Sequence, residues 1–203
     1  MIGVLGGTFD PIHYGHLRTA LDVQQALGLD EIRLVPLRDP PHRDAPLTTP
    51  RQRLEMVQAA VESNPLFHVD DRELRRDGKS YSVDTLRSLR QELGDTLPIC
   101  LVMGSDAFRG FADWHQPENI LELAHLVIMQ RPGEAPIDLY RQRITNDPAQ
   151  LKTQRGGLIL FQAVTQLEIS ATGIRSLIAK GRSPRYLLPK RVLKIIEAQG
   201  LYR

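Results

Sequence analysis

Glycines, two histidines and a carboxylate lie together near the start of the chain. Residues 6–16 read GGTFDPIHYGH and follow an apolar run typical of a buried strand. A glycine turn lets the backbone approach a phosphate, and the helix start behind it supplies unpaired N–H groups and a partial positive charge. His13 and His16 add side-chain donors in an H-x-G-H pattern. The segment therefore predicts a phosphate site between a strand and the next helix.

Three other interpretations of this segment fit its residues less well. A dinucleotide-binding turn needs G-x-G-x-x-G and an acidic residue closing the second strand, and neither is present. Asp10, His13 and His16 have a spacing tolerable for a metal held by one carboxylate and two histidines. A glycine between the histidines suits the approach of a phosphate better than a metal shell. A tight turn with capping residues alone would not need two histidines.

The rest of the sequence predicts the elements that position this segment. Short β-branched runs alternate with stretches of helical period, which indicates an α/β fold with a doubly wound, mostly parallel, Rossmann-like sheet. The expected strands are residues 2–5, 31–36, 66–70, 99–103, 126–130 and 158–163.

Helix signals punctuate the intervals between these strands. Thr49, Pro50 and Gln52 offer an N-cap, a first-turn proline and a capping-box glutamine for a helix over residues 50–63. A helix is expected to begin near His16, and the last one covers residues 189–199. Four glycines are placed to end helices, namely Gly28, Gly94, Gly181 and Gly200. The basic run 72–79 is interpreted as a solvated loop or hairpin.

Composition limits the classes of function. The 203 residues fit a single domain, 1–203, in which 164–203 form a helical C-terminal part. With 26 Lys and Arg against 24 Asp and Glu, the net charge of +2 argues against nucleic acid or an anionic membrane as a partner. The sequence shows no export signal and no apolar run of the ~20 residues that a membrane span needs. A single cysteine, Cys100, is expected to be buried in the apolar strand 99–103, and it favours a reducing, cytoplasmic location. A homo-oligomer stays open.

A second motif lies near the C-terminal end. Residues 169–175 read ISATGIR, in which Ser170 or Thr172 is a natural helix cap and Arg175 falls in the first turn or so of the helix. Together with H-x-G-H, this pattern resembles the H-x-G-H nucleotidyltransferase superfamily, which is similar to class I aminoacyl-tRNA synthetases in fold and phosphate handling.

Blocks in the middle of the chain narrow the resemblance to bacterial nicotinate-mononucleotide adenylyltransferases. The blocks are Pro40-Pro41-His42-Arg43, Ser80-Tyr81-Ser82-Val83-Asp84-Thr85-Leu86, Met103-Gly104-Ser105-Asp106 and Trp114-His115. Arg43 stands where the family more commonly has lysine, and Ser82 stands where it has threonine. Residues 82–85 resemble a helix start with Ser82 as its cap. The blocks keep the order of the family over nearly the whole chain.

The resemblance implies transfer of AMP from ATP to nicotinate mononucleotide, with Mg²⁺ entering with ATP. It implies catalytic roles for His13, His16 and Arg175. The residues expected to bind ATP are Gly6, Gly7, Thr8, Phe9, His13, Gly15, His16, Gly104, Asp106, Ser170, Thr172 and Arg175. The residues expected to bind the second substrate are Asp10, His42, Arg43, Thr85 and Trp114. The alternatives are another adenylyltransferase, such as one acting on phosphopantetheine, and a nucleotide-sensing module without turnover.

Overall fold

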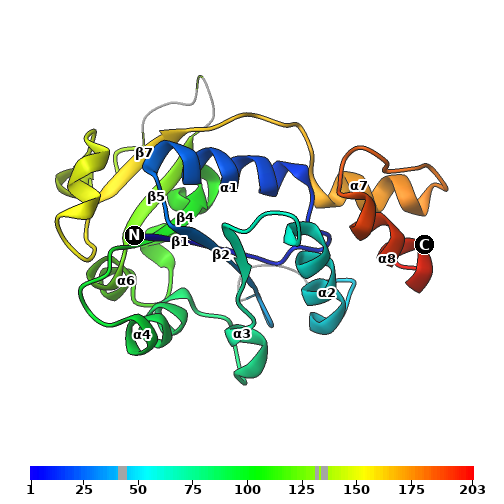
Figure 1. Cartoon of the computed structure of the whole chain (residues 1–203), viewed down its shortest axis with the longest axis horizontal. Helices are drawn as coiled ribbons and strands as arrows, with labels where there is room; N and C mark the ends of the chain where they lie inside the picture. The colour runs from blue at the N-terminus through cyan, green and yellow to red at the C-terminus, as the bar shows by residue number, and fades with distance from the viewer. Residues whose placement is uncertain (41–44, 131–132, 134–136) are drawn as a thin grey trace.

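A parallel sheet forms the centre of the computed structural model, which describes residues 1–40, 45–130, 133 and 137–203 (Figure 1). The described residues form seven strands in the order β3-β2-β1-β4-β5-β7-β6, and every neighbouring pair is parallel. The strands are β1 (Ile2–Gly7), β2 (Glu31–Pro36), β3 (Phe67–Val69), β4 (Ile99–Gly104), β5 (His125–Gln130), β6 (Ile144–Thr145) and β7 (Ile159–Ala163). The expected α/β fold with a parallel sheet is confirmed.

Helices cover both faces of this sheet because its strands are apolar on both sides. They are α1 (Tyr14–Leu27), α2 (Pro50–Val61), α3 (Arg72–Arg75), α4 (Ser82–Leu93), α5 (Ser105–Arg109), α6 (Pro117–Leu123), α7 (Ala171–Ala179) and α8 (Lys190–Gln199). In Figure 1, α1 lies on one side of the sheet, and α4 and α6 lie on the other.

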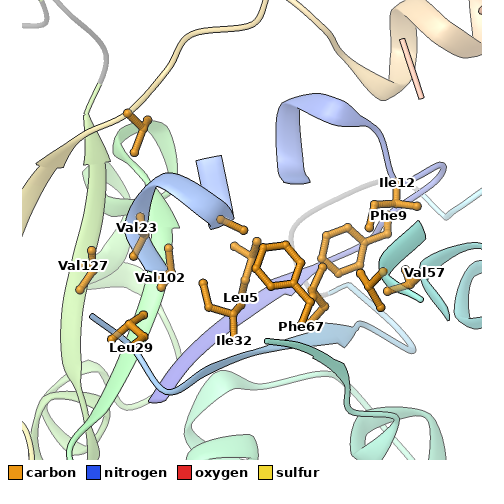
Figure 2. Close-up of a cluster of buried hydrophobic side chains, with 14 of the residues drawn as sticks. Leu5, Phe9, Ile12, Val23, Leu29, Ile32, Val57, Phe67, Val102 and Val127 are labelled. Carbon is orange, nitrogen blue, oxygen red and sulfur yellow. The ribbon is translucent and has the colours of Figure 1, made fainter. Parts of the chain in front are cut away.

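Successive side chains of each central strand point alternately into two apolar cores. In β4, Cys100 and Val102 pack with α1, α2, α7 and α8, whereas Leu101 and Met103 pack with α4 and α6. Figure 2 shows the first of these cores, with Val102 and Val127 at one end and the loop residues Phe9 and Ile12 beside Val57 at the other. The loop that follows β1 is therefore anchored by its own apolar side chains.

The strand order has a topological switch point at β1 and β4. The chain runs outward from β1 to β2 and β3, and then returns to place β4 on the other side of β1. Connections leave neighbouring strands in opposite directions at such a switch point, and ligands bind there in open α/β sheets. Leu5 pairs with Val102, so Gly7 and Gly104, each two residues further on, end their strands at the same level.

The local signals in the sequence are mostly realised. Thr49 and Gln52 form both halves of the capping box on α2, and Gly28, Gly94 and Gly200 have positive φ at helix ends. The first helix begins at Tyr14, two residues before the expected start, and its N-cap is His13. Tyr81, and not the expected Ser82, is the N-cap of α4.

Two short elements differ from the expectation. Residues 72–75 of the basic run form the one-turn helix α3, and the side chain of Glu73 in this helix is buried. Residues 144–145 add the edge strand β6, which is too short to leave a pattern in the sequence. Within the part of the chain that the structure describes, no helix combines the length and apolar character needed to cross a membrane.

Candidate active site

The loop between β1 and α1 stacks its two histidines. The rings of His13 and His16 are parallel to within 27°, with centroids 3.8 Å apart, and the ring of Phe9 meets His16 edge-on at 5.2 Å. Phe9 itself is buried in the core and has a φ of 51°. The buried Phe9 side chain therefore supports the His16 ring, and any contact of Phe9 with ATP is made by its backbone.

Two glycines make this stacking sterically feasible. A Cβ atom on Gly15 would lie 2.9 Å from Nδ1 and Cε1 of His13, and one on Gly7 would lie 2.7 Å from the Phe9 ring. Contacts below 3.0 Å essentially do not occur for real Cβ atoms, so a side chain at either position would displace a ring. The glycines of the motif thus set the positions of His13 and Phe9 as well as leaving room for a phosphate.

His13 is buried and carries an unsatisfied polar atom. Burial lowers the pKa of His13 to about 4, so its imidazole is neutral at physiological pH. The Nδ1 atom of His13 is buried and has no hydrogen-bond partner among the described residues. A buried polar atom without a partner costs free energy, so the packing of the loop holds His13 in a position that hydrogen bonding alone does not favour.

The second motif contacts the first through a guanidinium. Nη1 of Arg175 donates to the backbone carbonyl of Asp10 at 2.7 Å, and its Nη2 donates to Oγ1 of Thr172 at 3.2 Å. These bonds use two of the five N–H donors of the arginine. Ser170 caps α7 by accepting from the Gly173 N–H at 3.0 Å, so its hydroxyl serves the helix and not Arg175.

The Asp10 side chain has internal partners. Its carboxylate accepts hydrogen bonds from the Leu47 N–H at 2.8 Å, from Oγ1 of Thr48 at 2.5 Å and from the Tyr202 hydroxyl at 2.7 Å. In the structure this carboxylate therefore braces the loop, and the expected contact of Asp10 with a substrate stays a prediction. Nor do Asp10, His13 and His16, all of which are described, form a group able to hold a metal ion.

Known proteins with this arrangement identify the family. The cytidylyltransferase-like family matches residues 4–177, which include both motifs. A protein of Halorhodospira halophila named "Probable nicotinate-nucleotide adenylyltransferase" is 51% identical over 99% of this chain and 94% of its own length. One of the same name from Methylococcus capsulatus is 47% identical over 100% of this chain and 99% of its own. The chain belongs to the nicotinate-nucleotide adenylyltransferase family.

A solved structure from the same class of enzyme also shares the fold of this chain. The Plasmodium falciparum nicotinic acid mononucleotide adenylyltransferase, solved in complex with NaAD, superposes with a TM-score of 0.74. The alignment covers 99% of this chain and 96% of the other, at 19% sequence identity. The two proteins thus share the fold although most of their side chains differ.

The family's G-S-D block lies at the carboxyl end of β4, the strand that pairs with β1. Gly104 ends β4, and a Cβ atom there would meet nothing within 4 Å, so its surface is open. Asp106 is exposed in the first turn of α5. Both residues therefore lie at the carboxyl edge of the sheet, next to the β1 loop, as expected for a nucleotide site.

Of the residues expected on the side of the second substrate, Asp10, Thr85 and Trp114 are described, and each contacts different neighbours. Thr85 is buried, and its hydroxyl donates to Oε1 of Glu73 at 2.5 Å. Burial in turn raises the pKa of Glu73. Trp114 is half-buried against Phe111, with ring centroids 5.6 Å apart. The expected His42 and Arg43 lie outside the described residues.

Sequence reasoning missed three features of this site. The rings of Tyr81 and His115 stack at 4.3 Å, which joins the start of α4 to the segment after Trp114. Tyr202 reaches the phosphate loop from the far end of the sequence. Arg53 is fully buried beside Met56 and Val57 on the apolar face of α2. Only Arg53 had a visible signal, a charged residue on the buried stripe of a helix.

Proposed function

We propose that this chain transfers AMP from ATP to nicotinate mononucleotide, giving deamido-NAD and pyrophosphate in NAD biosynthesis. The observation that carries the proposal is the contact of Arg175 with the Asp10 carbonyl, which joins the segments that carry the two motifs of the family. The names of the full-length relatives and the NaAD complex of the Plasmodium protein support nicotinate mononucleotide as the acceptor.

The nucleophile needs little activation. The second pKa of a phosphate monoester is ~6, so the phosphate of nicotinate mononucleotide is already largely dianionic at neutral pH. One of its oxygens forms a bond to the α-phosphorus of ATP as the bond to the bridging oxygen of pyrophosphate breaks. No proton has to be removed, so the chain has only to align the reactants and stabilise developing charge.

The phosphate loop supplies donors for that charge. We assign the α-phosphate to His16 and to the backbone of Gly7 and Thr8, and the β- and γ-phosphates to His13 and Arg175. A neutral His13 donates through one ring nitrogen, and the phosphates would favour its protonated form once bound. Thr172 steadies Arg175 through the hydrogen bond between their side chains.

The remaining assignments follow the family resemblance. Gly104 and Asp106 would contact the ribose of ATP, and Arg43 and His42 would lie on the mononucleotide side. Thr85 and Trp114 would border the nicotinate ring. The stacked Tyr81 and His115 rings add an aromatic surface beside Trp114 to this region.

Magnesium is proposed as part of the MgATP substrate. A phosphate-bound Mg²⁺ keeps several waters and needs few protein ligands, and no group of three or more His, Cys, Asp or Glu side chains within the described ranges is placed to hold a metal. We also propose a cytoplasmic location, with which the free, buried thiol of Cys100 agrees.

A pyrophosphate-release assay tests the function. Purified protein with MgATP is offered nicotinate mononucleotide, nicotinamide mononucleotide or phosphopantetheine in separate reactions. Release with nicotinate mononucleotide is expected to be the fastest. Release only with phosphopantetheine would assign the chain to that other adenylyltransferase, and ATP binding without release would indicate a sensing module.

A further inference from the structure

The side chain of Arg53 joins segments that belong to the phosphate site. It is 0% exposed, and its guanidinium contacts backbone carbonyls instead of a carboxylate. Nη1 donates to the carbonyls of Thr8 at 3.0 Å and of Leu37, and Nη2 donates to that of Arg38 at 3.2 Å. A longer contact of 3.5 Å links Nε to the Thr48 carbonyl. One side chain thus binds the loop after β1 to the segment after β2.

The bond to Thr8 fixes the orientation of one peptide unit in the phosphate loop. The carbonyl of Thr8 and the N–H of Phe9 belong to the same planar unit, and in a trans peptide they point in opposite directions. Because Arg53 holds the carbonyl, the Phe9 N–H must point away from the buried guanidinium. The Phe9 ring, packed in the core below His16, resists rotation of this unit from the other side.

Asp10 fixes the other end of the same loop. Its carboxylate accepts from Leu47, Thr48 and Tyr202, and it provides the negative charge that partly offsets the buried guanidinium of Arg53. Removing the charge of either Arg53 or Asp10 would leave the buried charge of the other without compensation. Thr8 and Asp10, on either side of Phe9, are thus held by internal contacts before any ligand binds.

We infer that Arg53 is a positioning residue of the phosphate site, which acts through the Thr8 carbonyl to aim the Phe9 N–H at the bound phosphates. The inference rests on the proposed function only in placing the ATP phosphates at this loop. Arg53 itself is separated from the ligand by the loop backbone. Its replacement should therefore weaken MgATP binding by at least tenfold without removing any group that touches ATP.

Arg90 provides a matched control. It is also buried, and its guanidinium donates to the backbone carbonyls of Gly94, Leu97, Leu123 and Arg155. Leu97 and Leu123 precede β4 and β5, so this second junction lies at the amino ends of the strands, at the edge opposite the phosphate loop. Replacing Arg90 removes a buried guanidinium that donates to backbone carbonyls, as replacing Arg53 does, but it leaves the phosphate loop unchanged.

The experiment compares Arg53→Lys and Arg53→Met with Arg90→Lys and Arg90→Met. Unfolding in urea gives the stability of each variant, and binding is measured below the onset of unfolding. Calorimetry gives the Kd for MgATP, without the second substrate, so that the result does not depend on turnover. Protein labelled with ¹⁵N-phenylalanine shows only five phenylalanine amides, and the variant Phe9→Leu assigns the Phe9 signal.

The inference predicts that the Arg53 variants and the Arg90 variants differ in their binding of MgATP. Wild-type protein and both Arg90 variants should show a shift of the Phe9 amide on addition of MgATP and similar Kd values. Arg53→Met should bind MgATP at least tenfold more weakly and lose the shift, and Arg53→Lys should give values between those of wild type and Arg53→Met.

If Arg53→Met does not fold, the same measurements on Arg53→Lys test the inference. An unchanged Phe9 response in a folded Arg53 variant, or equal losses in the Arg53 and Arg90 pairs, would overturn the inference. Failure of pyrophosphate release by the wild type would count against the proposed function alone.

Discussion

Arg175 donates a hydrogen bond of 2.7 Å to the backbone carbonyl of Asp10, a residue 165 positions earlier in the chain. The contact joins the start of α7 to the loop between β1 and α1. It brings an arginine of the second motif to the loop that carries the histidines of the first, and it makes the second motif part of the support of that loop. Arg175 thus steadies the loop, and under the proposed function its remaining N–H donors would bind phosphate.

Replacing Arg175 by alanine should raise the KM for ATP at least tenfold and slow turnover. AMP lacks the β- and γ-phosphates assigned to Arg175, so its Kd should change little. Kinetics with ATP and calorimetry with AMP measure the two effects. Arg182→Ala, which removes an exposed arginine just beyond α7, is the control. Equal losses of ATP and AMP binding would show that support of the loop is the main role of Arg175.

His16→Ala should lower kcat by ~10²-fold or more, because it removes a donor aimed at charge that develops in the transition state. The melting temperature should change little, since the His16 ring is only partly buried. The control is His68→Ala, which removes an exposed histidine on β3. Near-normal turnover in His16→Ala would refute the assignment of His16 to the α-phosphate.

The buried His13 should make stability depend on pH. The pKa of His13 falls from 6.5 in the unfolded chain to about 4 in the fold because of burial, so the unfolded state binds a proton first as the pH drops. The corresponding stability, ~3 kcal/mol, is complete above pH 6.5 and is lost as the pH falls towards 4. Urea unfolding across this range should show a smaller slope for His13→Asn. His125, whose pKa is also lowered by burial, should maintain part of the slope. An identical pH dependence of wild type and variant would contradict the assigned pKa.

Nicotinate mononucleotide should be preferred over its amide by at least ~10-fold in kcat/KM, which is ~1.4 kcal/mol of transition-state binding. At the start of α4, the N–H groups of Asp84 and Thr85 already donate to the Tyr81 carbonyl, which leaves those of Ser82 and Val83 as donors for a carboxylate. Asp84 pairs with Arg87 at 3.3 Å, which offsets its negative charge. The comparison requires equal magnesium and salt, and parity of the two substrates would rule out this helix start as the source of selectivity.

The sequence predicted those features that depend on local chemistry. The capping box of Thr49 and Gln52, the cap at Ser170 and the burial of Cys100 each follow from neighbouring residues, and each is present. The shift of the α4 cap from Ser82 to Tyr81 depends on backbone angles, which residue types constrain only loosely.

Contacts between distant segments could not be predicted in the same way. The carboxylate of Asp10 looked available for a substrate because its partners, Thr48 and Tyr202, lie 38 and 192 positions away. Thr85 likewise looked available until the fold placed Glu73 against its hydroxyl. In both cases a polar side chain that the motif suggested for binding is held by a partner that only the tertiary structure supplies.

The most direct test of the proposed reaction follows the α-phosphate of ATP. With [α-³²P]ATP, Mg²⁺ and nicotinate mononucleotide, the label should appear in a product that co-migrates with deamido-NAD, whereas [γ-³²P]ATP should label only pyrophosphate. The two products should form in equal amounts, and His16→Ala should reduce both together. Label from [γ-³²P]ATP in the nucleotide product, or no transfer of the α-label to nicotinate mononucleotide, would contradict adenylyl transfer by this chain.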